Sequence, residues 1–249
     1  MNSKPVAETA SHLDRSRMPS HVAVIMDGNG RWAKKRLMNR IKGHEQGVKS
    51  VRTIVSVCRE LEIPILTLYA FSTENWKRSK IEVASLMMLL KKFLESEKEE
   101  LMEKEIRLRM IGQMDRLPED VQATLKSVME TTKKNGIMTL NLALSYGGRT
   151  EITDMVIRIA GKVRTGTIDP EQITAELIED HLYTSGLSDP DILIRTSGEM
   201  RISNFLLWQI AYSEIFVTDT LWPDFGRDEF IEILKQFQSR ERRFGNVLS

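Results

Sequence analysis

The sequence predicts an α/β fold with a mostly parallel central sheet of about six strands flanked by helices. Three observations predict it. Six short apolar runs alternate with amphipathic helical patterns, which is typical of a parallel sheet covered on both faces. Most of the runs are apolar at nearly every position, as strands buried on both faces are. No repeat, low-complexity segment or linker rich in Pro and Gly interrupts the alternation, so we expect one domain over residues 21–249 after a mobile tail over residues 1–20.

The boundaries of each element follow from where its pattern stops. The first apolar run ends abruptly at Asp27, and the glycines after it indicate a turn at which a helix begins, near Gly28–Arg31. An apolar stripe through Ile54 and Cys58 marks the buried face of the next helix. The predicted strands are Val22–Met26, Ile65–Ala70, Ile106–Ile111, Met138–Leu144, Asp191–Ile194 and Glu214–Thr218. The predicted helices are Gly43–Leu61, Lys80–Glu105, Glu119–Asn135, Arg149–Val163, Asn204–Tyr212 and Arg227–Ser239.

The composition excludes several classes of protein. Of the 249 residues, 41% are hydrophobic and 29% charged, which is enough for a sizeable core, and the formal net charge of +1 gives no global attraction to nucleic acid. Cys58 is the only cysteine, so the chain has no intramolecular disulfide and no cysteine metal cluster. Residues 1–20 lack the apolar segment of a signal peptide, and the apolar stretch Phe205–Tyr212 is too short to cross a bilayer. We therefore expect a soluble, cytoplasmic protein.

Polar and basic loops follow four of the predicted strands. They are DGNGRW (27–32), FSTENWKRS (71–79), SYGGRT (145–150) and RTSGEMRISNF (195–205). Ligands of parallel sheets bind beyond the carboxyl ends of the strands, so we expect these loops to form one site. Backbone N–H groups at a helix start and arginine side chains both bind anions. The arginines exceed what a monophosphate requires and favour one diphosphate or two: Arg31, Arg40, Arg78, Arg195 and Arg201.

Asp27 stands beside this anion site, where a carboxylate would repel phosphate unless a cation lies between them. That arrangement indicates Mg²⁺, which binds one or two carboxylates together with substrate oxygens. Glu214, at the start of the last predicted strand, is either a second metal ligand or a plain surface carboxylate. Other phosphate chemistries lack their motifs: there is no P-loop, no second aspartate two residues after Asp27, no DDxxD and no GxGxxG.

Taken together, these stretches resemble the cis-prenyltransferases, and most closely the bacterial undecaprenyl diphosphate synthases. The similarity extends over residues 21–245, and motifs this long, in this order, are very specific. The matching stretches are HVAVIMDGNGRWA (21–33), GHEQG (43–47), TLYAFSTENWKR (67–78), LNLALSYGGR (140–149), IRTSGEMRISNFLLWQIAYSE (194–214), LWPDF (221–225) and RERRFG (240–245).

The resemblance implies a reaction and a set of roles. An allylic diphosphate, normally farnesyl diphosphate, is extended by repeated addition of isopentenyl diphosphate in Z geometry, with Mg²⁺ as the cofactor. Asp27 and Glu214 match the metal carboxylates, and Asn75 matches a residue often assigned to proton removal, although an amide is a poor base. Residues matching the allylic diphosphate site and its flank are Gly28, Asn29, Gly30, Arg31, Trp32, Arg40 and His44. Those matching the isopentenyl diphosphate site are Arg195, Arg201, Ile202 and Ser203, and those on the mobile loop are Ser72, Thr73, Glu74, Trp76 and Arg78.

The resemblance also implies a product and partners. The product is a long polyprenyl diphosphate, of undecaprenyl length as the lipid carrier for cell-wall synthesis, and it requires a hydrophobic tunnel whose floor is often set at the position of Met138. We expect a homodimer in which Arg243-Phe244-Gly245 of one chain completes the neighbouring site, and transient contact with the inner face of the membrane during product release. The alternative is a non-catalytic partner subunit, but such partners lose residues that this chain keeps, among them Asp27 and Asn75.

Overall fold

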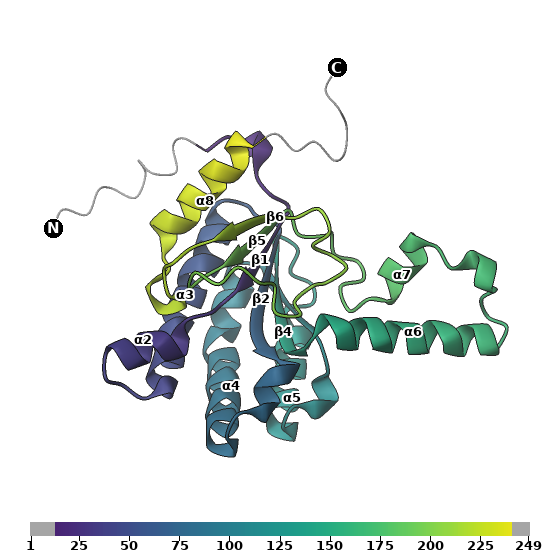
Figure 1. Cartoon of the computed structure of the whole chain (residues 1–249), viewed down its shortest axis with the longest axis horizontal. Helices are drawn as coiled ribbons and strands as arrows, with labels where there is room; N and C mark the ends of the chain where they lie inside the picture. The colour runs from purple at the N-terminus through teal and green to yellow at the C-terminus, as the bar shows by residue number, and fades with distance from the viewer. Residues whose placement is uncertain (1–12, 241–249) are drawn as a thin grey trace.

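A six-stranded sheet, parallel throughout, runs through the centre of the molecule (Figure 1). The structure is a computed structural model, and it describes residues 13–240. The strand order is β3-β4-β2-β1-β5-β6, so β1 lies inside the sheet between β2 and β5. The strands are β1 (His21–Ile25), β2 (Ile65–Ser72), β3 (Ile106–Ile111), β4 (Met138–Tyr146), β5 (Ile192–Arg195) and β6 (Glu214–Val217). All six predicted strands are confirmed to within two residues at each end.

Most of the long helices cover one face of the sheet. Strand side chains such as Leu66 and Leu140 form the main core there with apolar residues of α3, α4, α5 and α8. The helices are α2 (Asn29–Lys35), α3 (Arg40–Glu60), α4 (Lys80–Glu103), α5 (Glu119–Thr132), α6 (Gly148–Arg164), α7 (Ala175–His181) and α8 (Arg227–Ser239). Short 3-10 turns are η1 (Arg15–Arg17), η2 (Thr73–Lys77), η3 (Met114–Arg116), η4 (Pro170–Gln172) and η5 (Trp222–Asp224). Within residues 13–240, no helix combines the length and the apolar character needed to span a bilayer.

The opposite face of the sheet is covered by an irregular segment instead of a helix. Phe205 and Leu206 pack there in a second core cluster, with the Phe205 ring stacked on Tyr69 at 4.3 Å between centroids. The predicted helix Asn204–Tyr212 is therefore wrong. Backbone φ is positive at Ser203 (49°), Asn204 (62°) and Leu206 (45°), which a right-handed helix cannot accommodate. The apolar residues of this segment are buried, although the segment forms turns instead of a helix.

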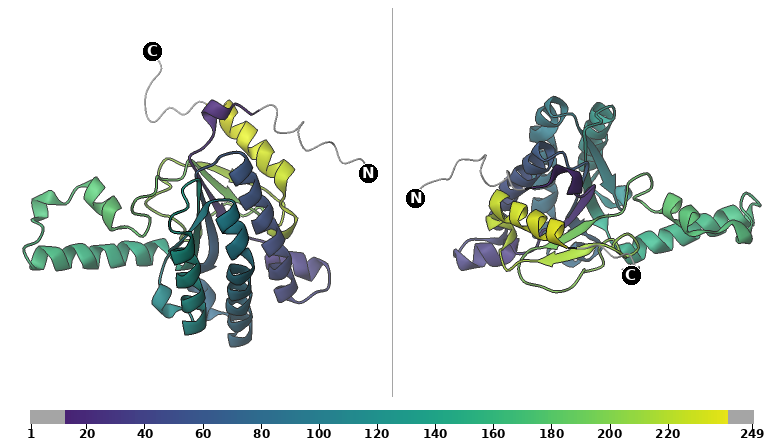
Figure 2. Two further views of the ribbon diagram at one scale, coloured as in Figure 1. Left: turned by 180° about the vertical axis from the view of Figure 1, so that it is seen from behind. Right: turned by 90° about the horizontal axis from the view of Figure 1, so that it is seen from above.

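Helices α6 and α7 form an arm that projects from the sheet (Figures 1 and 2). A buried carboxylate, Glu151 of α6, anchors the base of the arm by accepting hydrogen bonds from the Tyr146 hydroxyl, the Gln209 amide and the backbone N–H of Tyr183. Sequence analysis predicted α6 but missed α7. Seven residues with few apolar side chains give too little periodicity to indicate a helix.

Residues 13–20 pack against α8, although the sequence placed them in a mobile tail. The side chain of Gln238 accepts a hydrogen bond from the backbone N–H of Asp14 (3.0 Å) and donates one to its carbonyl (2.8 Å). Leu13 is buried in the main core. The predicted tail is therefore wrong for residues 13–20, and residues 1–12 lie outside the described part of the chain.

Three buried polar side chains cross the middle of the sheet. Nδ2 of Asn141 donates to Oγ1 of Thr67 (3.1 Å), which lies 2.7 Å from Nε2 of His21, and Nδ1 of His21 lies 2.6 Å from the carbonyl of Ser188. Because a carbonyl only accepts, Nδ1 of His21 carries a proton and Nε2 accepts from Thr67. Burial lowers the pKa of His21 to about 4, so its ring is neutral at pH 7.

Candidate active site

Asp27 lies at the carboxyl edge of the sheet, directly after β1, and binds two arginines. Its Oδ2 accepts a hydrogen bond from Nη2 of Arg195 (2.8 Å), at the end of β5, and pairs with Nη2 of Arg31 (3.2 Å) in α2. Burial by itself would raise the pKa of Asp27, but the hydrogen bond from Arg195 and the charge of Arg31 outweigh it and lower that pKa. The carboxylate is therefore ionised at neutral pH.

Arg195 is a buried arginine, only 4% exposed, whose guanidinium is held by several acceptors. Besides Asp27, it donates from Nη1 to Oγ of Ser203 (2.7 Å) and to the carbonyl of Arg201. Its Nε has no hydrogen-bond partner among the residues that the structure describes. A fixed guanidinium with one unused donor at the edge of the sheet is suited to an anionic ligand.

Arg31 connects α2 to the loop after β5. It donates from Nη1 to the carbonyl of Ser197 (3.0 Å) and to Oε1 of Glu199 (3.2 Å), and from Nη2 to Oγ of Ser197. Glu199 also pairs with Nη1 of Arg201 (2.5 Å). Sequence analysis missed Glu199, because a carboxylate among arginines gives no motif; only the fold shows that it holds two of the predicted site arginines.

Two glycines of α3 allow the start of α2 to approach very closely. A Cβ added at Gly43 would lie 2.0 Å from the carbonyl oxygen of Asn29, and one added at Gly47 would lie 2.4 Å from its Oδ1. No other residue type fits at these distances, which explains both glycines of the GHEQG stretch. The crossing buries Asn29 so that its Oδ1 has no hydrogen-bond partner within residues 13–240.

An open cavity of about 590 Å³, here called the outer cavity, lies in front of Asp27. Four other residues of the predicted diphosphate site also line this cavity. A Cβ added at Gly30 would lie only 3.0 Å from Nε of Arg40. The absence of a side chain at Gly30 therefore leaves room for the Arg40 guanidinium. The outer cavity is lined by Asp27, Gly28, Gly30, Arg31, Lys34, Leu37, Met38, Asn39 and Arg40.

A second cavity of about 170 Å³, the inner cavity, extends between the sheet, α3 and α4. One end is polar and carries Asn29, His44, Asn75 and Arg78. The rest is apolar and includes Leu68, Phe71, Leu86, Met87, Leu89, Leu90, Phe93, Leu142 and Leu144. The structure thus contains an apolar cavity, whereas the predicted tunnel for a long chain stays a prediction.

His44 lines the polar end of the inner cavity as a neutral imidazole. Burial lowers its pKa to about 4, and the positive charge of Arg78 acts in the same direction. Its Nε2 has no hydrogen-bond partner in the described chain. Glu82, at the start of α4, bridges the neighbouring arginines by pairing with Nη1 of Arg78 (3.0 Å) and Nη1 of Arg40 (3.7 Å). Glu82 was also missed from the sequence, and it keeps the two arginines together at the mouth of the cavity.

The loop after β2 is ordered as the 3-10 turn η2, which its own side chains cap. Oδ1 of Asn75 accepts a hydrogen bond from the backbone N–H of Ser72 (3.1 Å), and Nε1 of Trp76 donates to Oγ of Ser145 (2.9 Å). Asn204 fixes the outer side of this turn by donating to Oε1 of Glu74 (3.0 Å). Thr73 donates to the other oxygen of the same carboxylate. The predicted loop residues therefore lie together, with Asn75 and Arg78 on the wall of the inner cavity.

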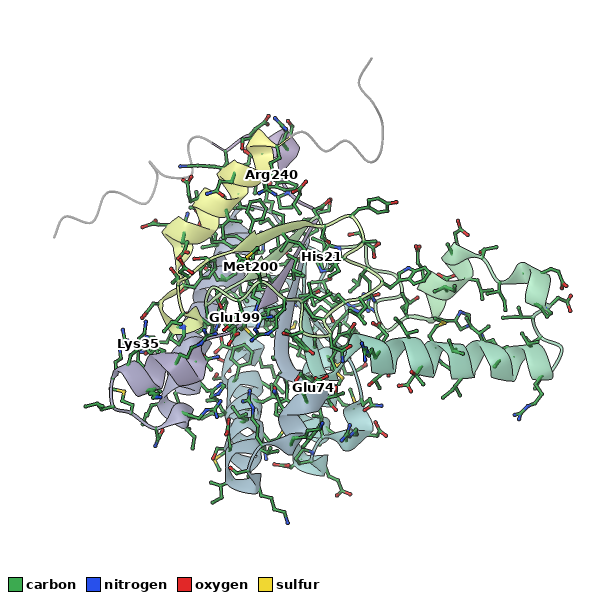
Figure 3. All side chains as sticks on the ribbon, viewed as in Figure 1. His21, Lys35, Glu74, Glu199, Met200 and Arg240 are labelled. Carbon is green, nitrogen blue, oxygen red and sulfur yellow. The ribbon has the colours of Figure 1, made fainter. Side chains whose placement is uncertain are left out.

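Within the described chain, three predicted site residues lie outside this arrangement: Glu214, Trp32 and Ile202. Glu214 begins β6 and therefore lies at the amino edge of the sheet, opposite Asp27, where it pairs with Arg240. Figure 3 shows Arg240 at the end of the molecule remote from Glu74 and Glu199. Within one chain Glu214 thus lies at the opposite edge of the sheet from Asp27, and its predicted role as a second metal ligand stays a prediction.

Trp32 and Ile202 are packed away from both cavities. Nε1 of Trp32 donates to Oδ1 of Asp224 (2.6 Å), its ring packs on Leu221, and the Arg36 guanidinium lies 4.0 Å from the ring centroid. Ile202 packs against the second core cluster. Both side chains support the walls of the site instead of facing a ligand in this structure.

Asp27 is the residue that fits a magnesium ion here. It is ionised and borders the outer cavity beside three arginines. No group of three or more His, Cys, Asp or Glu side chains that could hold a metal occurs within residues 13–240. Mg²⁺ binds one or two carboxylates together with substrate oxygens, so Asp27 would hold the ion jointly with a bound substrate.

Comparisons with known proteins agree with this geometry. The sequence profile described as putative undecaprenyl diphosphate synthase matches residues 25–245. The chain belongs to the cis-prenyltransferase family. The isoprenyl transferase of Halalkalibacterium halodurans is 50% identical over 240 residues, covering 96% of this chain and 94% of that protein. The isoprenyl transferase of Bacillus subtilis is 48% identical over 239 residues, covering 96% and 92%.

Two solved structures share the fold. The lavandulyl diphosphate synthase from Lavandula x intermedia, in complex with dimethylallyl diphosphate, superimposes with a TM-score of 0.91 at 38% identity, covering 93% of this chain and 100% of that one. A probable undecaprenyl diphosphate synthase from Campylobacter jejuni gives a TM-score of 0.76 at 38% identity, covering 92% and 99%. The family and the α/β fold predicted from the sequence are confirmed, and the two relatives differ in the product that they are named for.

Proposed function

We propose that the chain is an active, Mg²⁺-dependent cis-prenyltransferase that adds isopentenyl diphosphate in Z geometry to an allylic diphosphate, farnesyl diphosphate being the expected primer. The observation that carries this proposal is the junction of the two cavities. Gly28 and Gly30 line the basic outer cavity, whereas Asn29 between them lines the apolar inner cavity. A substrate with a diphosphate head and a prenyl tail would span this junction.

The described residues divide the chemistry between them. When an allylic diphosphate departs, negative charge develops on it, and Arg31 and Arg40, which line the outer cavity, would stabilise that charge. Mg²⁺ held at Asp27 would supply further charge neutralisation. The inner cavity would exclude water from the allylic cation. Because Oδ1 of Asn75 already accepts from a backbone N–H, we assign Asn75 to orienting the loop and the loss of the proton to the departing diphosphate.

The product that we propose is undecaprenyl diphosphate, the lipid carrier for cell-wall synthesis. A chain of that length exceeds the inner cavity, so α3 and α4 would have to separate as the product grows. Similarity to the lavandulyl diphosphate synthase favours a second candidate, a short product made from a small primer such as the dimethylallyl diphosphate bound there. The length of the product distinguishes the two.

We also propose that the enzyme is a cytoplasmic homodimer that contacts the membrane transiently to release its product. β6 is an edge strand, and it exposes Ile215 and Val217. Val156 and Ile157 are exposed on α6. Apolar side chains on an unpaired strand edge and a projecting arm support association with a second copy. The predicted contribution of Arg243-Phe244-Gly245 to the neighbouring site lies outside the described residues.

The test is an assay of the full-length chain with radiolabelled isopentenyl diphosphate, Mg²⁺ and either farnesyl or dimethylallyl diphosphate. We expect label in long chains with the farnesyl primer, resolved by chromatography, and none after chelation by EDTA. Incorporation confined to short products would support the second candidate. A folded protein that incorporates no label with either primer would overturn the enzymatic proposal and favour the non-catalytic partner subunit.

A further inference from the structure

The connection between α2 and α3 exposes two apolar side chains at its tip. Leu37 is 98% exposed and Met38 is 49% exposed. Leu37 also has a positive φ of 56°, so this connection holds its tip in a conformation that bulky side chains rarely adopt. Residues 28–44 around the tip contain six basic residues and no acidic residue, although the whole chain carries a net charge of only +1. Four of the six pair with carboxylates: Arg31, Arg36, Arg40 and Lys42. Lys34 and Lys35 are exposed and form no ion pair among residues 13–240.

A second apolar surface lies on the first turns of α4. Ile81 is 78% exposed and Met88 is 69% exposed, and their spacing of seven residues places them on one side of the helix. Lys77 and Lys80 are exposed at the start of this helix. The opposite side of the same helix lines the inner cavity with Leu86, Leu89 and Leu90.

The two surfaces meet at the mouth of the site. Arg40, which begins α3, pairs with Glu82, the residue after Ile81. Figure 1 shows the α2–α3 connection and the start of α4 at the same end of the molecule, and Lys35 lies at the outer end of α2 (Figure 3). Leu37 and Met38 also line the outer cavity. Leu37 and Met38 therefore border the basic outer cavity, whereas Ile81 and Met88 lie on the helix that covers the apolar inner one.

We propose that Leu37, Met38, Ile81 and Met88, with the surrounding lysines, form a docking face for a lipid surface rich in anionic phospholipid. Exposed apolar side chains among basic residues are the pattern of interfacial membrane binding, in which apolar groups enter the headgroup region and lysines bind anionic lipid. A protein partner would need acidic groups matched to the lysines, whereas a bilayer needs only the mixture seen here. Docking in this orientation would bring the diphosphate cavity level with the lipid headgroups.

The use of this face rests on the proposed function, because only a lipid product needs a route into a bilayer. A prenyl chain leaving the inner cavity between α3 and α4 would enter the bilayer directly, without crossing water. Its diphosphate would stay beside Arg40 and the lysines until it left with the lipid. The binding of the protein to vesicles can nevertheless be measured with no substrate present.

The test is flotation of the full-length chain with vesicles of equal parts phosphatidylglycerol and phosphatidylcholine, compared with phosphatidylcholine alone. We expect binding to the anionic vesicles that weakens as salt is added. Leu37→Ser/Met38→Ser and Ile81→Ser/Met88→Ser should each weaken binding on the order of 10-fold. The matched control, Met102→Ser/Ile137→Ser, removes two exposed apolar side chains at the amino edge of the sheet and should bind as the wild type does. Circular dichroism checks that each variant is folded.

Inorganic pyrophosphate separates the docking face from the diphosphate site. One outcome is that pyrophosphate abolishes vesicle binding by the wild type while both apolar double variants bind as well as the wild type does. That outcome would mean that the anion site alone captures lipid phosphate, and it would overturn the docking face. Absence of vesicle binding in a chain that still transfers prenyl groups in detergent would overturn it as well, leaving the enzymatic function intact. If the wild type binds vesicles, the docking-face variants do not, and the wild type forms no prenyl product, the docking face would be supported and the proposed function overturned.

Discussion

At the scale of single residues, Asp27 and Arg195 form the ion pair on which the site is built. We expect Asp27→Asn to lower turnover by about 10³-fold or more, because an amide binds Mg²⁺ more weakly than a carboxylate does and cannot balance the charge of the arginine. Arg195 is buried, so losing its counter-charge should also lower the free energy of unfolding by about 3 kcal/mol. Steady-state kinetics at saturating Mg²⁺ and urea denaturation measure the two effects. Near-normal turnover in the folded variant would rule out the catalytic role.

Arg40 and Arg201 lie on different loops and should serve different substrates. Arg40 lines the outer cavity beside Gly30, whereas the Arg201 side chain is exposed and pairs with Glu199. We expect Arg40→Ala to raise KM for the allylic primer more than KM for isopentenyl diphosphate, and Arg201→Ala to do the reverse, by about 10-fold for a lost charged hydrogen bond. The control is Arg107→Ala, at an exposed position of β3. If each site variant raised both KM values equally, the two-site division would be wrong.

At the scale of elements, the crossing of α2 over α3 depends on Gly43. We expect Gly43→Ala to lower the free energy of unfolding by about 1–3 kcal/mol, because the new methyl group would overlap the carbonyl of Asn29. Displacing α2 should also raise KM for the allylic primer. Gly161→Ala is the matched control: this glycine lies within α6 with no heavy atom near its added Cβ, so the change should stabilise the protein by about 0.5–1 kcal/mol. Urea denaturation compares the two, and equal effects would refute the crossing argument.

The hydrogen-bonded chain across the sheet should make stability depend on pH through His21. Its pKa is lowered to about 4 in the folded state, from 6.5. Below pH 6.5 the unfolded chain binds a proton that the folded chain does not take up until about pH 4, so the free energy of unfolding falls as pH decreases through this window. Above pH 6.5 the contribution is constant. His44 behaves in the same way.

His21→Asn isolates this contribution. Between pH 7 and pH 5, His21 should account for about 2 kcal/mol of the decrease in unfolding free energy, at ~1.4 kcal/mol per pH unit below 6.5. The variant should be less stable than the wild type at pH 7, because Thr67 loses its acceptor, and should lose correspondingly less stability on acidification. Urea denaturation at the two pH values measures both. Parallel pH profiles for the wild type and the variant would show that His21 titrates normally in the folded protein.

At the scale of the whole molecule, the length of the product depends on how far the apolar space extends along the sheet. Met138 begins β4 at the amino edge and is buried, and it shares a sheet face with Leu142 and Leu144 at the inner cavity. A tunnel that lengthened down this face would end at Met138. We therefore expect Met138→Ala to shift the products toward longer chains, as read by chromatography at equal substrate ratios.

The competing expectation for Met138→Ala is loss of stability alone, by about 2–5 kcal/mol, as for any large core residue. Met155→Ala is the control, because Met155 is also buried but belongs to the separate apolar cluster formed within the arm. It should be destabilising and leave chain length unchanged. A destabilised Met138→Ala enzyme with the wild-type product distribution would mean that Met138 is not the floor.

The strands, most of the helices and the residues that follow the strand ends could be predicted from the sequence. This was possible because buried parallel strands and amphipathic helices each leave a periodic pattern, and because ligands bind beyond the carboxyl ends of the strands. Asp27, Arg31 and Arg195 were found in this way, and they meet in the structure. Glu214 begins its strand and so lies at the other edge of the sheet, and its role at a metal stays a prediction.

The contacts between segments that are distant in the chain could not be predicted and became apparent in the three-dimensional fold. Glu82 and Glu199 carry no motif, and their roles follow from the arginines that the fold brings to them. Asn204–Tyr212 is apolar enough to read as a helix, but left-handed residues turn it across the second face of the sheet. The periodicity of apolar residues indicates which residues are buried. The pairing between elements and the sign of φ depend on which other parts of the chain pack against each segment.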